Sequence, residues 1–238
     1  MKRFLLLGGT GFLGRALCEH LVGWEADKRI TVATRRLVHA RELQFLPTTV
    51  PIECDVHDDA QLERLVAGHD AVVNLIGILH GSAADFDRTH VQLARRLATA
   101  CARTGVKRVL QVSALGVDGD KASHYLRSKA EAEGVLRGAA LDLTVLRPSV
   151  MFGAQDRLLN LFATLQWALP IVPLAAAEAQ LQPVWVEDVA EALLRCLQRL
   201  DTVGQTYECA GPQVFTLSEL VRLAGRCSGH ERDRKSVV

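Results

Sequence analysis

Several residue types that mark particular classes of protein are scarce in this sequence. The six cysteines are widely spaced, and no two of them form a CxxC pair. Such cysteines favour free, buried thiols in a reducing compartment over disulfides or a cysteine-ligated metal, so we expect no metal site. The formal net charge is +1, because 28 Lys and Arg are balanced by 27 Asp and Glu. This balance argues against a nucleic-acid-binding surface and against a polybasic membrane anchor.

Long hydrophobic runs are also missing. The apolar start is only a few residues long and leads directly into glycines, which predicts no signal peptide and a cytoplasmic location. The longest uncharged stretch, residues 158–177, is interrupted by Pro170 and Pro173. Such a stretch is more typical of an apolar lid or a docking surface than of a membrane span. A peripheral membrane complex is compatible with this pattern.

The most informative stretch is a glycine-rich turn near the start of the chain. Residues 4–7 are apolar and suit a buried strand, and four glycines follow within residues 8–14. Leu13, Leu17 and Leu21 then recur every four residues, as on one face of a helix. A strand, a tight glycine turn and a helix start form the fingerprint of a dinucleotide-binding site, in which the first helical turn binds the pyrophosphate. The alternative is a glycine-rich turn that serves packing alone.

Two arginines follow the second predicted strand, residues 29–34. Arg35 and Arg36 stand where an acidic residue would bind the ribose 2′-OH of NAD, and no Asp or Glu occupies that strand end. Arginine at this place accommodates the 2′-phosphate of NADP. We therefore favour NADP(H) over NAD(H), with solvated surface arginines as the alternative.

Apolar strands and amphipathic helices alternate up to Pro148. This alternation predicts right-handed βαβ units and an α/β fold, a Rossmann doubly wound parallel sheet in residues 1–148. Residues 149–226 are expected to form a small, truncated C-terminal substrate lobe interleaved with the sheet. Residues 227–238 end in a sequence that resembles a translated sequencing adaptor, and we interpret them as a non-native tail. Further strands are predicted at 50–54, 71–76, 109–112, 143–146 and 205–209, and helices at 61–67, 86–103, 122–136, 158–167, 187–199 and 218–225.

A tyrosine and a lysine stand four residues apart in the helix predicted over residues 122–136. This spacing places Tyr125 and Lys129 on one helical face. A tyrosine has an unperturbed pKa of about 10, and a nearby lysine cation with an oxidised nicotinamide would favour the phenolate. Tyr125 could then exchange a proton with a substrate, while Lys129 holds ribose and Ser113, at the preceding strand end, binds the reacting oxygen. The alternative is an amphipathic helix with a half-buried tyrosine and a solvated lysine.

Together these segments resemble the extended and atypical short-chain dehydrogenase/reductases, which include the NAD-dependent epimerase/dehydratase-like proteins. The resemblance rests on the glycine turn, on Tyr125-x-x-x-Lys129, on Arg147-Pro148 and on residues 183–190. Longer strings are similar to one branch, which holds the nucleotide-binding accessory subunit of respiratory complex I and its bacterial relatives. These strings are residues 33–36, 74–80, 112–116 and 125–129.

The resemblance implies a Rossmann fold with bound NADP(H), and in the respiratory complex a nucleotide held structurally without turnover. It assigns the glycine turn to the pyrophosphate, Arg35 and Arg36 to the 2′-phosphate, and Asp55 with Val56 to the adenine edge. It assigns Tyr125 and Lys129 to the active-site pair. The residues expected to contact the dinucleotide are Gly8, Thr10, Gly11, Phe12, Leu13, Gly14, Arg35, Arg36, Asp55, Val56, Leu75, Ile76, Gly77 and Lys129.

Two departures from the family pattern bear on catalysis. His90 stands where catalytic relatives often have asparagine, and Ser113 stands one or two residues before the expected catalytic serine or threonine. Three functions therefore stay open. The first is an NADP(H)-dependent oxidoreductase that acts on an unknown small molecule. The second is a sugar-nucleotide epimerase, dehydratase or reductase. The third is a non-catalytic nucleotide-binding module that docks to a protein partner.

Overall fold

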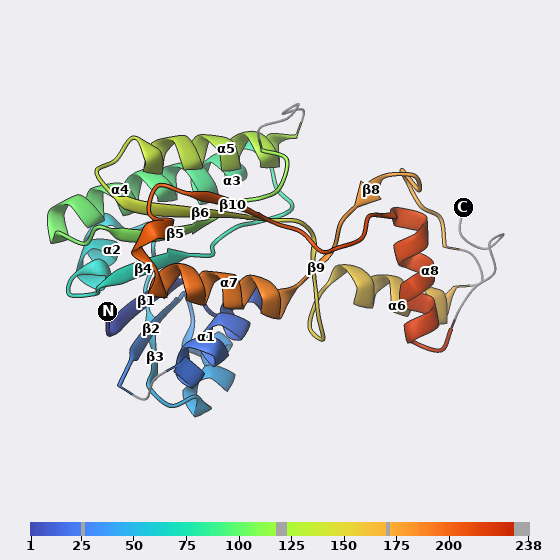
Figure 1. The fold of residues 1–238 in the computed structure, drawn as a ribbon, viewed down its shortest axis with the longest axis horizontal. Helices are drawn as coiled ribbons and strands as arrows, with labels where there is room; N and C mark the ends of the chain where they lie inside the picture. The colour runs from blue at the N-terminus through green and yellow to red at the C-terminus, as the bar shows by residue number, and fades with distance from the viewer. Residues whose placement is uncertain (25–26, 118–122, 170–171, 231–238) are drawn as a thin grey trace. The chain divides into compact units, whose positions relative to one another are not determined.

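The computed structural model describes residues 1–24, 27–117, 123–169 and 172–230. This part of the chain divides into two compact units, whose elements are labelled in Figure 1. The first unit contains residues 1–148 and 187–208, and the second contains residues 149–186 and the chain from Cys209 onward. The predictions that concern Ala122, Pro170 and residues 231–238 lie outside the described residues.

A seven-stranded sheet forms the centre of the first unit (Figure 1). From one edge to the other, its strands are β10 (Thr206–Cys209), β6 (Asp142–Pro148), β5 (Arg108–Val112), β4 (Ala71–Asn74), β1 (Arg3–Leu7), β2 (Arg29–Thr34) and β3 (Thr49–Glu53). The pairings from β3 through to β6 are all parallel. The order 3-2-1-4-5-6 is that of a doubly wound Rossmann sheet, which confirms the predicted fold class.

Helices cover both faces of this sheet (Figure 1). On one face α2 (Asp59–Val66), α4 (Leu93–Thr104) and α5 (His124–Arg137) bury leucines such as Leu62, Leu97 and Leu136 against alternate strand residues. On the other face lie α1 (Phe12–Trp24) and α7 (Val186–Gln198). The alternation of inward-facing strand residues between the two faces follows from the two-residue period of a strand.

The helix predicted over residues 86–103 begins earlier and changes its pitch. Here α3 (Ala83–Phe86) continues into a π-helical segment, η3 (Asp87–Gln92), and then into α4. A capping box starts α3, because Ser82 Oγ accepts from the Asp85 N–H at 3.2 Å while the Asp85 carboxylate accepts from the Ser82 N–H at 2.9 Å. A π-helical turn inside a helix is frequently found at a functional site.

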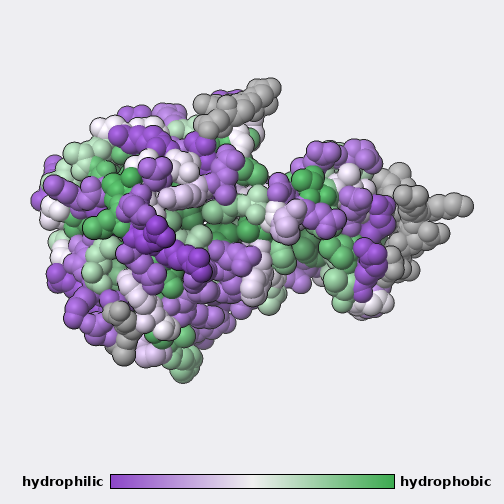
Figure 2. Space-filling view, viewed as in Figure 1, coloured by the Kyte–Doolittle hydropathy of each residue, from purple (hydrophilic) through white to green (hydrophobic). Residues whose placement is uncertain are grey.

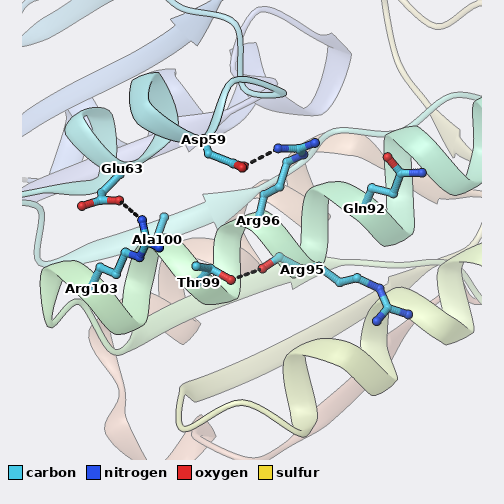
Figure 3. Close-up of a pocket in the computed structure, with 8 residues that line it drawn as sticks. All are labelled: Asp59, Glu63, Gln92, Arg95, Arg96, Thr99, Ala100 and Arg103. Carbon is cyan, nitrogen blue, oxygen red and sulfur yellow. Dashed lines mark hydrogen bonds and ion pairs between the residues drawn. The ribbon is translucent and has the colours of Figure 1, made fainter.

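Ion pairs join α2 to α4 on the surface of the first unit (Figure 3). Arg96 pairs with Asp59, and Arg103 Nη1 lies 2.9 Å from the Glu63 carboxylate. These four residues line a groove of about 310 Å³. Since both arginines have carboxylate partners, the groove is best explained as part of the packing between the two helices. Exposed pairs of this kind contribute modestly to stability.

Residues 187–208 pack in the first unit, although the sequence analysis grouped them with the substrate-side lobe. Buried Arg108 of β5 makes the connection. Its Nη1 donates to Thr144 Oγ1 of β6 at 2.8 Å, and its Nη2 donates to Cys196 O of α7 at 2.6 Å. The same Nη2 donates at 2.9 Å to Thr202 Oγ1, in the short helix η4 (Leu200–Thr202). The Arg108 guanidinium therefore connects β5 and β6 to residues 187–208 through its hydrogen bonds.

The second unit has a small core of its own. Two helices, α6 (Leu158–Ala168) and α8 (Leu217–Cys227), pack through Phe162, Val172, Val221 and Ala224. Two short strand pairs accompany them: β7 (Met151–Phe152) is parallel to β9 (Val184–Trp185), and β8 (Gln180–Leu181) is antiparallel to β11 (Phe215–Thr216).

Hydrophobic residues also reach the surface of the second unit (Figure 2). On α6, Leu161 is 52% exposed and Trp167 is 65% exposed. Among the described helices, none combines the length and the apolarity that crossing a bilayer requires.

A close approach of α1 to the end of β1 depends on one glycine. A Cβ at Gly14 would lie 2.5 Å from both Gly8 O and Gly9 Cα, which is far inside normal contact distance. Gly23, in the same helix, has no heavy atom within 4 Å of the position that its Cβ would take. The two glycines therefore differ in what a methyl group would meet.

We expect Gly14→Ala to lower the free energy of unfolding by about 1–3 kcal/mol, because the backbone has to shift to admit the methyl group. We expect Gly23→Ala to raise it by roughly 0.5–1 kcal/mol, because alanine favours the helix and restricts the unfolded chain. Urea unfolding followed by circular dichroism measures both changes. Changes of the same sign in the two variants would contradict the close approach at Gly14.

Candidate functional site

The glycine turn connects the carboxyl end of β1 to the first turn of α1. Gly8 has a φ of +84°, and the Gly11 N–H donates to Gly8 O at 3.0 Å. Thr10 and Phe12 are half-buried in this turn, whereas Leu13 is buried. The first turn of α1 contains no acidic residue. Its N–H groups and the positive end of the helix dipole are therefore suited to an anion.

The segment after β4, residues 75–77, lies against this turn. A Cβ on Gly8 would be 3.1 Å from the Ile76 nitrogen. Asn74 fixes the segment, because its Oδ1 accepts from the Ile76 N–H at 3.2 Å while its Nδ2 donates to Gln111 Oε1 at 2.9 Å. The sequence analysis did not single out Asn74 or Gln111. Both are buried polar residues next to apolar strand residues, which is the signal that could have identified them.

A pocket of about 690 Å³ opens at the carboxyl ends of β2 and β3. Arg35 and Asp55 both line it, whereas Arg36 and Val56 do not. The Arg35 and Arg36 side chains are exposed, and Val56 is buried. The residues that line the pocket are Arg35, Glu53, Cys54, Asp55, His57, Gln61, Ile78, His80, Asp85, Arg88 and Thr89.

Two short 3-10 helices, η1 (Leu37–Ala40) and η2 (Glu42–Phe45), follow the arginine pair. Thr34 Oγ1 donates to the Arg36 carbonyl at 3.0 Å, which turns the chain at the end of β2. The Glu53 carboxylate accepts from the Leu37 N–H at 3.2 Å. This acidic residue of the pocket is therefore engaged in holding η1 in place.

The pocket also contains one cationic side chain that sequence reasoning missed, Arg88. The pKa of His57 is lowered, first by burial and then by Arg88, with smaller contributions from Arg96 and Arg35, while Asp55 opposes the shift. Arg88 comes from η3, far along the chain from β2. No local motif marks Arg88, so only the folded arrangement reveals its proximity to Arg35.

Lys129 of α5 points toward the ends of β4 and β5. It is 4% exposed, and its Nζ donates to Val112 O at 3.2 Å and to Ile76 O at 3.5 Å. Burial lowers the pKa of this ammonium to about 8, and the nearby Glu133 carboxylate opposes the shift. The alternative prediction from the sequence, in which Lys129 is solvated, is therefore wrong.

Tyr125 lies one helical turn before Lys129 and packs against two rings. Its ring centroid is 6.1 Å from that of Phe86 and 5.8 Å from that of His90, both in edge-on geometry. Burial raises the pKa of the Tyr125 phenol. This direction is opposite to the one that we expected from Lys129. Burial is the cause of the raised pKa, and the Lys129 ammonium is turned toward the carbonyl oxygens of Ile76 and Val112.

Ser113 follows β5 directly and is 3% exposed. Its N–H donates to Leu146 O at 2.7 Å, but its Oγ has no hydrogen-bond partner among the described residues. A buried hydroxyl without a partner is unfavourable, and such groups are commonly completed by a ligand or a water molecule. Ser113 therefore offers a donor and an acceptor next to Val112, whose carbonyl binds Lys129.

These features suit a dinucleotide along the carboxyl edge of the sheet. The glycine turn leads into a helix start whose backbone N–H groups suit a pyrophosphate. The pocket beside Arg35 suits an adenosine with additional negative charge, and the region of Lys129 and Ser113 offers polar atoms for a ribose and a ring. Ligand binding at the carboxyl ends of the strands, where the strand order reverses, is the general behaviour of doubly wound sheets.

Known proteins support this interpretation. A family model described as NAD(P)H-binding matches residues 8–167. The rat protein NADH dehydrogenase (ubiquinone) 1 alpha subcomplex subunit 9, mitochondrial, is 33% identical over 222 residues, which cover 91% of this chain and 59% of that protein. The Arabidopsis thaliana protein of the same name is 33% identical over 228 residues, covering 92% and 56%. This chain thus spans less than two thirds of the length of these relatives.

A solved structure shows the same fold. The crystal structure of a double mutant of DesIV, a dTDP-glucose 4,6-dehydratase from Streptomyces venezuelae with NAD and DAU bound, matches with a TM-score of 0.86 and 24% identity, covering 99% of this chain and 83% of that one. The chain therefore belongs to the NAD(P)H-binding family, and its predicted resemblance to the complex I accessory-subunit branch of the short-chain dehydrogenase/reductases is confirmed.

Proposed function

We propose that this chain binds NADP(H) and holds it as a short-chain dehydrogenase/reductase-like module of the complex I accessory-subunit type. One observation carries the preference for NADP(H): Arg35 follows β2 directly and lines the pocket in which an adenosine would lie. NAD-specific sites have a carboxylate at this strand end, which would repel a 2′-phosphate. Here the residues after Thr34 are both arginines.

The proposed contacts follow the carboxyl edge of the sheet from one strand to the next. Residues 8–14 would bind the pyrophosphate through backbone N–H groups. Arg35, with Arg36 beside it, would face the 2′-phosphate, and Asp55 with Val56 would border the adenine. Residues 75–77 would lie along the middle of the dinucleotide, and Lys129 would bind the nicotinamide ribose.

The proposed partner is a respiratory protein complex, because the relatives are named as subunits of NADH dehydrogenase. The exposed Leu161 and Trp167 of the second unit are apolar side chains of the kind that such a partner could cover. We further propose a location on the cytoplasmic side, peripheral to the inner membrane. In this role the nucleotide is retained and is not turned over.

Catalysis is the second candidate function, and the unpartnered Ser113 hydroxyl is the observation that favours it. The nicotinamide would supply a hydride to a carbonyl carbon of an unknown small-molecule substrate. Ser113 Oγ would donate a hydrogen bond to the carbonyl oxygen, and Tyr125 would transfer its phenolic proton to that oxygen. The resulting phenolate would regain a proton from water. Sugar nucleotides are one substrate class for such chemistry.

Arg35→Ala should weaken NADPH binding by roughly 10- to 100-fold, as expected for the loss of a charge-assisted hydrogen bond of about 1.5–3 kcal/mol. NADH binding should change by less than about two-fold, because NADH has no 2′-phosphate to pair with the guanidinium. Titration of nucleotide fluorescence measures both dissociation constants.

Arg103→Ala is the matched control for the arginine prediction. Arg103 is also a surface arginine of the first unit, but it pairs with Glu63 in a different groove. It should leave both dissociation constants unchanged. Equal losses of NADPH and NADH affinity in Arg35→Ala would refute the 2′-phosphate assignment.

The retained and catalytic roles can be separated on the purified protein. In the retained role, denaturation should release about one equivalent of NADP(H), identified by mass spectrometry, and incubation with dTDP-glucose or UDP-N-acetylglucosamine should give no product by NMR. Turnover of either sugar nucleotide that disappears in Tyr125→Phe, with NADPH binding preserved, would instead establish the catalytic role.

The buried Lys129 predicts a specific dependence of stability on pH. Because burial lowers its pKa from 10.5 to about 8, the folded protein loses this proton at lower pH than the unfolded chain. The cost of the buried charge is therefore present below pH 8 and is relieved as the pH rises toward 10.5. Relative to Lys129→Met, the wild-type protein should gain on the order of 3 kcal/mol over this window. Urea unfolding of both proteins across this range measures the difference, and parallel curves would contradict the assignment.

A further inference from the structure

His90 lies in the π-helical segment η3 and is only 3% exposed. Both of its ring nitrogens have hydrogen-bond partners. The Ile78 N–H lies 3.2 Å from Nε2, and Ser128 Oγ lies 2.7 Å from Nδ1. A backbone N–H can only donate, so Nε2 accepts and carries no proton. The single proton of the neutral ring is therefore on Nδ1, from which it is donated to Ser128 Oγ.

The hydrogen bonds continue into α5. Because Ser128 Oγ accepts from His90, its own hydroxyl proton is available for the Tyr125 carbonyl, which lies 2.8 Å away. Each group in this series donates to the next, from the Ile78 N–H through His90 and Ser128 to the Tyr125 carbonyl. The series links the chain just after β4 to the first turns of the helix that carries Tyr125 and Lys129.

The charge state of the ring agrees with this assignment. Burial, and secondarily the Lys129 ammonium, lower the pKa of His90 to about 3. Tyr125 is a second titratable group that faces the ring, at a centroid distance of 5.8 Å. The imidazole is therefore neutral between pH 5 and 8, and both of its hydrogen bonds keep their direction.

Gly77 lies where His90 and Lys129 meet. A Cβ on Gly77 would be 3.0 Å from Lys129 Nζ and 3.5 Å from His90 Nε2. Lys129 donates to the Ile76 carbonyl on one side of this glycine, and His90 accepts from the Ile78 N–H on the other side. The two side chains therefore hold the same three-residue segment from α5 and from η3.

We propose that His90 is a positioning residue of the nucleotide site. It couples residues 76–78 to α5 through two directed hydrogen bonds, and so fixes the place of the Lys129 ammonium and the Tyr125 ring relative to the middle of a bound dinucleotide. This inference rests on the proposed function for the identity of the ligand. A histidine that only fills the core would need its volume and not these two hydrogen bonds.

The test compares His90→Phe with His90→Asn. Phenylalanine keeps the ring but removes both hydrogen bonds, and it should weaken NADPH binding by about ten-fold. The asparagine amide can accept from one group and donate to another, so His90→Asn should recover most of the affinity despite its smaller size. Equilibrium titration of NADPH fluorescence measures all three proteins, and thermal unfolding reports their stability.

His69→Phe is the matched control. The His69 ring is half-buried and bonds Thr31 Oγ1 at 2.8 Å, and it precedes β4 at the opposite end of that strand. This variant should lose stability without losing NADPH affinity. An affinity in His90→Phe equal to that of the wild type, or an affinity in His90→Asn no better than in His90→Phe, would overturn the positioning role.

Nitrogen-15 NMR of the histidine ring tests the geometry independently of any ligand. The expected signature is a neutral ring protonated on Nδ1 from pH 5 to 8, and it should persist in Ser128→Ala because the Ile78 N–H still requires Nε2 to accept. A ring that is protonated on Nε2 in the wild type, or that titrates near pH 6.5, would overturn the inference even if His90→Phe fails to fold. Failure of the wild type to bind NADPH, with the NMR signature intact, would instead count against the proposed function.

Discussion

The arrangement of the site depends on the hydrogen bonds that replace the lost hydration of the buried Lys129 ammonium. Lys129 loses its hydration inside the first unit, and a buried charge is tolerated only where polar groups replace water. The carbonyl oxygens of Ile76 and Val112 supply these contacts at the ends of β4 and β5. This requirement places α5 over two neighbouring strand ends and brings Tyr125 to the same edge. It also explains why Gly77 has no side chain, since a Cβ would crowd the Nζ atom.

A second buried charge fixes the other half of α5. The Glu133 carboxylate accepts two hydrogen bonds from the Arg147 guanidinium at the end of β6, at 3.0 and 2.8 Å. Since a buried pair is strongly destabilised when one partner is removed, this contact constrains the position of α5 more than an exposed pair would. Lys129 and Glu133 therefore anchor successive turns of one helix to three neighbouring strands. These anchors position Tyr125 and Lys129 on α5.

Local patterns predicted most of the fold and part of the site. The glycine turn, the strand periodicity and the Tyr125–Lys129 spacing are each encoded within a few residues, so they could be recognised without a structure. Contacts between segments that lie far apart in the sequence could not be recognised in this way. Neither Arg88 beside Arg35 nor His90 bonded to Ser128 follows from a local pattern. The direction of the Tyr125 pKa shift could not be predicted either, because it depends on how deeply the folded chain buries the phenol.

The two ends of the site differ in a way that bears on turnover. At the Arg35 end, the exposed Arg35 and Arg88 line an open pocket together with three carboxylates, so a phosphate there would pair with the arginines. At the Tyr125 end, burial raises the phenol pKa, which favours the protonated phenol over the phenolate. The ammonium that could lower it is already bonded to two carbonyl oxygens, and moving it toward the phenol would break those bonds while it stays buried. The same contacts that hold residues 76–78 in place thus keep the Lys129 charge from stabilising a Tyr125 phenolate.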